Sequence, residues 1–319
     1  MNCAILGAGL GVIAILGIWV GQSRLRSPML RASGEPYVKN IHQIWFQGAK
    51  NVPERFEPMR AGCSDINSDW NMLLHDEQAL RSFCENVDRV DPSINMVDLF
   101  DSAEHMHEKI DMGRLAALYK HGGVSLDMDI HCLNEIDNIV ATVPRDGLGL
   151  CSAPRGPLMS LFHHGQNVAS LNNAVWVVPQ AESPVLLDVI GTMAAGARAN
   201  YAEKPSASKY HRIESTWGPR ATSIAIAKHG DKNIVMLEGL EEPSFSGEKS
   251  SCKASSALCH VHEGSWLDNR LLVSRPASAL IERYTKRPFA AELVLAAGLG
   301  AAVMMLLCRI GCRRSKQEK

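Results

Sequence analysis

Residues 109–130 read KIDMGRLAALYKHGGVSLDMDI, and this stretch decides the fold. Apolar residues recur at helical spacing up to Gly122 and Gly123, and glycines at such a place are typical of a helix end. A short apolar run follows and ends in Asp127 and Asp129, one residue apart. In an extended strand these two carboxylates share a face, and they repel one another unless a cation lies between them. Carboxylates suit Mg²⁺ or Mn²⁺, so the pattern predicts a metal site that holds a nucleotide diphosphate.

Asp111 and Arg114 lie in the helical part of this stretch, three residues apart, so they are neighbours on the helix surface. An ordinary surface ion pair, which contributes little to stability, is one interpretation. The second interpretation is that both side chains face a sugar beside the metal. The spacing is compatible with either.

Apolar runs at 42–46, 123–130 and 174–178 alternate with helical stretches at 76–86 and 184–194. This alternation predicts an α/β fold with a mainly parallel central sheet. Ligands of such sheets collect at the carboxyl ends of the strands, where the two aspartates are expected.

A group of residues in the opening stretch resembles the signature of glycosyltransferase family 32 and its relatives with a D-x-D sugar-binding region: Asp111, Arg114, Tyr119, Gly122, Gly123, Asp127 and Asp129. The segments IHQIWFQG (41–48) and HVHEGSW (260–266) resemble the first strand and the closing segment of that family. The match runs in order over residues 38–270. Ser125 departs from the pattern, because many members carry an aromatic residue there.

The resemblance implies a GT-A type nucleotide-sugar-binding fold and metal-dependent hexosyl transfer with retention of configuration. The catalytic residues that it implies are Asp111, Arg114, Asp127 and Asp129. The implied metal ligands are Asp127, Asp129 and His260, with His262 as a competing candidate. The implied substrate-binding residues are His42, Gln43, Trp45, Asn173, Ser265 and Trp266. For two of these residues a purely structural role is the alternative: Asn173 could belong to a turn before a strand, and Trp266 could be a core residue.

The expected cofactor is Mn²⁺ or Mg²⁺, and the expected donor is GDP-mannose or a UDP-sugar. The expected acceptor is a glycan or a glycolipid, and the resemblance to inositol-phosphoceramide mannosyltransferases points to a membrane sphingolipid. Two alternatives stay open. One is another metal-dependent phosphoryl-transfer enzyme, which would normally show more acidic ligands or a phosphate-binding glycine loop. The other is an inactive membrane-anchored scaffold, which would be expected to have lost one of Asp127, Asp129 and Arg114, and all three are present.

Both ends of the chain predict a membrane helix. Residues 3–20 carry no charge, and residues 289–308 carry one, so we expect a signal-anchor over 1–22 and a second span over 289–308. A linker (23–37) and the catalytic domain (38–285) lie between them, and a basic tail (309–319) follows. The tail favours a cytoplasmic C-terminus and a lumenal domain in the Golgi or another endomembrane. Arginines at 24, 26 and 31, on the domain side of the first span, argue against this topology.

Charge and cysteine content limit the remaining possibilities. The 319 residues carry a net charge of −1, which gives no electrostatic case for binding nucleic acid. Six cysteines lie within the expected domain, an even number that permits disulfides in a lumen, with Cys252 and Cys259 as the expected local pair.

Overall fold

The computed structural model describes residues 37–152, 171–203, 209–230, 232–237, 241–243 and 256–261. Its strands are β1 (Asn40–Ile44), β2 (Asn71–His75), β3 (Gly123–Leu126), β4 (Ile130–Cys132), β5 (Leu148–Ser152), β6 (Leu171–Val178), β7 (Ile234–Leu237), β8 (Glu241–Pro243) and β9 (Leu258–His260). Its α-helices are α2 (Glu57–Ile66), α3 (Glu77–Val90), α4 (Met96–Ser102), α5 (Met106–His121), α6 (Asp137–Val140), α8 (Pro184–Glu203), α9 (Lys209–Thr216) and α10 (Pro219–His229). Two 3-10 turns (Ala49–Asn51 and Glu54–Phe56) precede α2.

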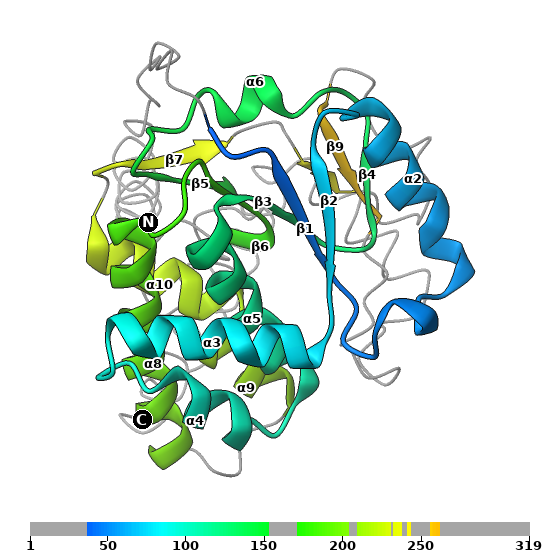
Figure 1. Ribbon diagram of the computed structural model, residues 1–319. Helices are drawn as coiled ribbons and strands as arrows, with labels where there is room; N and C mark the ends of the chain where they lie inside the picture. The colour runs from blue at the N-terminus through cyan, green and yellow to red at the C-terminus, as the bar shows by residue number, and fades with distance from the viewer. Residues whose placement is uncertain are drawn as a thin grey trace, which may run out of the picture.

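The central sheet has the strand order β2-β1-β3-β6-β5-β7 (Figure 1). Strand β6 pairs antiparallel with both of its neighbours, and the other pairings are parallel, so five strands run in one direction. The predicted α/β class with a mainly parallel central sheet is therefore confirmed. A separate three-stranded sheet has the order β4-β9-β8.

Both faces of the central sheet are covered. Along β6, Trp176 and Val178 pack into a core with the helices α3, α4, α5, α8 and α10. Val175 and Val177, which alternate with them, pack into a second core with α2 and α6. This alternation follows from the two-residue period of a strand. Figure 1 shows α2 beside β4 and β9, away from the helices of the first core.

Local sequence signals set the bounds of α5, the helix that leads to the aspartates. His105 and Glu108 form a capping box at its N-terminus. Gly122, with a φ of 62°, ends the helix, as predicted. Gly123 follows with a φ of 106°, and a Cβ atom at this position would lie 2.3 Å from the backbone oxygen of Asn40. Glycine is therefore required where β3 begins beside β1.

The predicted membrane spans, residues 3–20 and 289–308, lie outside the described residues. Among the helices that the structure describes, none has the length and apolarity that a bilayer crossing requires.

Candidate metal and sugar site

The D-x-D residues form a turn between the two sheets. Strand β3 ends at Leu126, and the backbone N–H of Ile130 donates to the carbonyl oxygen of Asp127 over 3.2 Å. The N–H of Asp127 donates to the carbonyl oxygen of Ala174 on β6 over 3.0 Å, at the edge of the central sheet. The prediction of one strand through residue 130 is wrong, because the chain turns here to enter β4.

Strand β9 brings His260 to this turn. It pairs antiparallel with β4, which places His260 opposite Ile130. The N–H of Val261 donates to the carbonyl oxygen of Asp129 over 3.0 Å. As a result, Nε2 of His260 lies 3.2 Å from Oδ1 of Asp129.

The three side chains fit one divalent ion. Asp127, Asp129 and His260 each offer a ligand atom, and these atoms lie within 4.8 Å of one another. Ligands held at about 2.1 Å from an octahedral ion are about 3 to 4 Å apart, so a small closure of this cluster suffices. The structure thus brings together the predicted metal ligands. The competing candidate His262 lies outside the described residues.

Arg114 connects the metal cluster to the helix α5. Its side chain is buried, and its guanidinium donates to the carboxylate of Asp127 and to the backbone oxygen of Asn173. Its Nη2 lies 3.9 Å from Oδ1 of Asp111, which in turn accepts a hydrogen bond from Nδ2 of Asn173 over 3.0 Å. Asp111 and Arg114 are therefore part of a partly buried polar network in which their side chains are 12% and 7% exposed, and the interpretation as a surface ion pair is wrong.

The carboxyl group of Asp111 lies in a strongly unfavourable environment for its charge. Burial raises the pKa of Asp111 to about 7, and Arg114 opposes this rise. The charges of Asp127 and Glu214 raise this pKa further, and the hydrogen bond from Asn173 lowers it. Asp111 is therefore harder to ionise than an ordinary aspartate.

Glu214 is a buried carboxylate whose charge acts on Asp111, and it was not predicted from the sequence. It lies on α9, it is 2% exposed, and it is close enough to influence the titration of Asp111. Thr216, on the same helix, donates to Oε1 of the buried Glu108 of α5 over 2.9 Å, which anchors α9 to α5. No local pattern marks Glu214, because its proximity depends on how α9 packs.

The three residues predicted on β1 have different surroundings. His42 is fully buried, with Nδ1 2.8 Å from Nε2 of His75 and Nε2 2.8 Å from the carbonyl oxygen of Gly122. Its ring belongs to the core, and the structure does not bring it to the metal cluster. Gln43 and Trp45 are better candidates for binding a ligand. Their buried Nε2 and Nε1 atoms have no hydrogen-bond partner among the described residues.

Trp45 also lies near the D-x-D turn. Its ring packs against Phe56 with a centroid distance of 5.4 Å, in an apolar cluster that contains Met128 and Val261. Ser265 and Trp266, the other predicted substrate-binding residues, lie outside the described residues.

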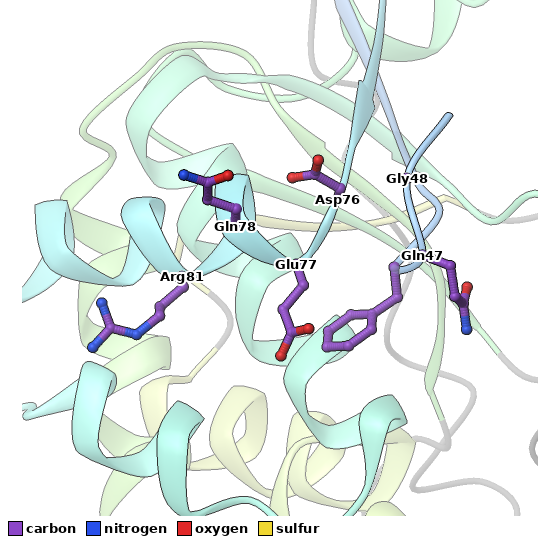
Figure 2. A pocket seen from close by; sticks show the side chains of 7 residues that line it. Gln47, Gly48, Asp76, Glu77, Gln78 and Arg81 are labelled. Carbon is purple, nitrogen blue, oxygen red and sulfur yellow. The ribbon is translucent and has the colours of Figure 1, made fainter. Parts of the chain in front are cut away.

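A pocket of about 520 Å³ opens beside the carboxyl ends of β1 and β2 (Figure 2). It is lined by Phe46, Gln47, Gly48, Asp76, Glu77, Gln78 and Arg81. Asp76 caps α3 by accepting a hydrogen bond from the N–H of Ala79 over 3.0 Å. Because β2, β1 and β3 are parallel neighbours, the pocket and the D-x-D turn lie along the same edge of the sheet.

Comparison with known protein families shows which class of protein has a similar sequence in this region. Residues 53–145 match the family described as glycosyltransferase sugar-binding region containing DXD motif. This segment contains α5, β3 and the turn with both aspartates. Residues 53–145 are therefore similar to the sugar-binding region of the D-x-D glycosyltransferases, and the resemblance predicted from the residues is confirmed.

Three relatives illustrate the likeness. An uncharacterized glycosyltransferase of Acanthamoeba polyphaga mimivirus is 31% identical over 31% of this chain and 38% of its own length. Inositol phosphoceramide mannosyltransferase 3 of Schizosaccharomyces pombe is 28% identical over 32% of this chain and 27% of its own length. A mannosyl phosphorylinositol ceramide synthase of Saccharomyces cerevisiae is 26% identical over 48% of this chain and 41% of its own length. The matched part thus spans less than half of each relative, and these likenesses support the prediction of a transferase.

Among solved structures, a glycosyltransferase named PaToxG is similar with a TM-score of 0.43 and 18% identity, over 68% of this chain and 76% of that one.

Proposed function

We propose that this protein is a metal-dependent retaining glycosyltransferase of the GT-A type. It would transfer a hexose from a nucleotide-sugar donor to a glycan or glycolipid. The observation that carries the proposal is the convergence of Asp127, Asp129 and His260 beside the partly buried Asp111–Arg114–Asn173 network. A metal cluster next to partly buried hydrogen-bonding groups suits a ligand with a diphosphate at one end and a sugar at the other.

Each residue of the cluster has a role in this proposal. Asp129 and His260 hold the divalent ion, which when bound offsets the charge that develops on the departing nucleoside diphosphate. Asp127, fixed by Arg114, completes the ligand set or contacts the ribose. Imidazole is a softer ligand than carboxylate oxygen, so we expect Mn²⁺ to be preferred over Mg²⁺.

The partly buried network would hold the sugar. Asp111 accepts, and the amide of Asn173 donates and accepts, so together they can bind sugar hydroxyls. Arg114 supplies a fixed positive charge at the side of the diphosphate. In the resting site that charge is shared with Asp127 and Asp111, which keeps the guanidinium in one orientation.

The nucleoside would lie along β1 and β2. The indole N–H of Trp45 and the amide of Gln43 are buried donors without a partner among the described residues, and such donors are costly unless a ligand uses them. The neighbouring pocket beside Asp76 offers the space for a base or ribose.

The names of the relatives suggest the substrates. Two of them are named for mannosyl transfer to inositol phosphoceramide. We therefore propose GDP-mannose as the donor to test before the UDP-sugars, and a membrane sphingolipid as the acceptor. The disulfide between Cys63 and Cys132 supports a lumenal domain, because disulfides persist in oxidising compartments. The predicted spans would place the enzyme in the Golgi or another endomembrane.

A donor screen tests the proposal. The purified full-length chain in detergent is incubated with Mn²⁺ and a panel of nucleotide sugars, and release of the nucleoside diphosphate is measured. We expect turnover with one donor, loss of at least about 100-fold in Asp129→Asn, and no change in Asp65→Asn, an exposed aspartate of α2. Turnover that survives in Asp129→Asn would remove the metal from the proposal. Absence of turnover with every donor, with nucleotide binding retained, would favour the inactive scaffold.

A further inference from the structure

Two of the candidate metal ligands, Asp129 and His260, lie beside or within a very small sheet. Strands β4, β9 and β8 have three residues each, and a sheet of this size is marginally stable by itself. Asp129 directly precedes β4, and His260 is the last residue of β9. The distance between these two ligands therefore depends on how firmly β4 and β9 are held.

A disulfide ties β4 to α2. Cys63 of α2 is bonded to Cys132, the last residue of β4, across a sequence separation of 69 residues. Both cysteines are almost completely buried. A second contact supports the same junction, because Oδ1 of Asn67, directly after α2, accepts a hydrogen bond from the N–H of Ile136 over 3.0 Å. The two links fix the segment that follows the D-x-D turn.

The same face of α2 also packs beneath the turn. Met59 lies four residues before Cys63, one turn of the helix away, and both are buried. Met59 belongs to the apolar cluster of Met128, Cys259 and Val261, which are neighbours in sequence of Asp127, Asp129 and His260. Cys259 is itself disulfide-bonded, so β9 carries a covalent tie next to the histidine.

We infer that the Cys63–Cys132 disulfide is a positioning device for the metal site, and that it sets the affinity for the divalent ion by holding Asp129 against His260. This inference rests on the proposed function for the identity of the site. It predicts that breaking the bond weakens metal binding in a protein that is still folded. A bond with a purely structural role would change only the melting temperature.

Metal affinity tests this inference without requiring catalysis. The full-length chain and the double variant Cys63→Ser/Cys132→Ser are titrated with Mn²⁺ alone, at a temperature where circular dichroism shows both to be folded. We expect the Kd for Mn²⁺ to rise by about 10- to 100-fold, the range seen when residues that support metal ligands are replaced. Hydrogen exchange of segments 127–134 and 256–261 should also accelerate.

Two further variants keep the test decisive. Cys63→Ala/Cys132→Val retains apolar volume without the bond, and it replaces the serine variant if that one does not fold. Cys84→Ser is the matched control, because Cys84 is a buried free thiol in the other core, on α3. We expect it to lower the melting temperature and to leave the Kd within about twofold.

The outcomes separate the two proposals. Equal Mn²⁺ affinity in the wild-type chain and in a folded variant without the disulfide would overturn the positioning role and leave the proposed function intact. Equal weakening by Cys84→Ser would also overturn it, because general loss of stability would then explain the effect. A wild-type chain that binds no Mn²⁺ would overturn both.

Discussion

Replacing Asp111 with asparagine should stabilise the metal-free protein. Asparagine has the shape of the protonated acid, and its amide oxygen can keep the 3.0 Å hydrogen bond from Nδ2 of Asn173. In the wild type, Asp111 must ionise in a poorly solvated position as the pH rises, and this ionisation is opposed by burial and by the charges of Asp127 and Glu214. The variant removes that ionisation.

The magnitude follows from the pKa of Asp111. It is about 7 in the folded protein, against an ordinary value of 3.8. Because the folded-state pKa of an acid is raised, its stability is highest at low pH and is lost as the pH rises from 3.8 through 7. At about 1.4 kcal/mol per pKa unit, the loss approaches about 4 kcal/mol at pH 8 and stays below about 2 kcal/mol at pH 5. Asp111→Asn should recover those amounts.

Urea unfolding in the presence of a chelator, followed by tryptophan fluorescence at pH 5 and pH 8, measures the effect. The expected result is a gain in unfolding free energy that is clearly larger at pH 8, together with loss of glycosyl transfer. Asp65→Asn, on the exposed surface of α2, should change neither quantity. A gain that is equal at both pH values, or a loss at pH 8, would refute the argument that the surroundings of Asp111 disfavour its charged form.

Two other predictions concern the framework around the site. Burial lowers the pKa of His42 to about 3 and of His75 to about 4, so the stability that these two histidines contribute is complete above pH 6.5 and is lost as the pH drops. Asp111 acts in the opposite direction, so the effect is measured in the Asp111→Asn background. Denaturant unfolding of that variant should show a loss of at least about 3 kcal/mol in unfolding free energy between pH 6.5 and pH 4, and adding His42→Gln should make this loss smaller. Gly123→Ala should cost about 3 kcal/mol in thermal unfolding, because its Cβ would lie 2.3 Å from the oxygen of Asn40 at a positive φ. The control Gly196→Ala, in α8 with open space around the position, should instead gain up to about 1 kcal/mol.

Much of the framework could be predicted because it depends on local signals. The helix that carries Asp111 and Arg114 has a regular apolar pattern and ends at Gly122, as the sequence indicates. The parallel sheet follows from the alternation of strands and helices. The residue types of the candidate metal site could also be predicted, because carboxylates and imidazole can bind metal ions in any local structure.

The site residues that were missed depend on long-range packing. The charge of Glu214 acts on Asp111 across the chain, and α9 is anchored to α5 through Thr216 and Glu108. No sequence motif indicates that Cys63 pairs with Cys132. The two cysteines meet because α2 packs beside β4. The surroundings of His42 also depend on long-range packing, since both of its ring nitrogens lie at hydrogen-bonding distance from residues far along the chain, His75 and Gly122.

At the D-x-D turn the two carboxylates come together through a local geometry that differs from the predicted strand. Two-residue alternation in a strand would by itself place both carboxylates on one face, but β3 ends before them. Their convergence instead depends on backbone hydrogen bonds to partners far along the chain, from Asp127 to Ala174 on β6 and from Val261 to Asp129 beside β9. A turn that is held only at its two ends can shift slightly to close around an ion. A strand inside a sheet cannot shift in this way, because neighbouring strands hold it on both sides. The candidate metal site therefore lies where the central sheet ends, and the proposed spacing of its ligands depends on the small sheet that carries His260.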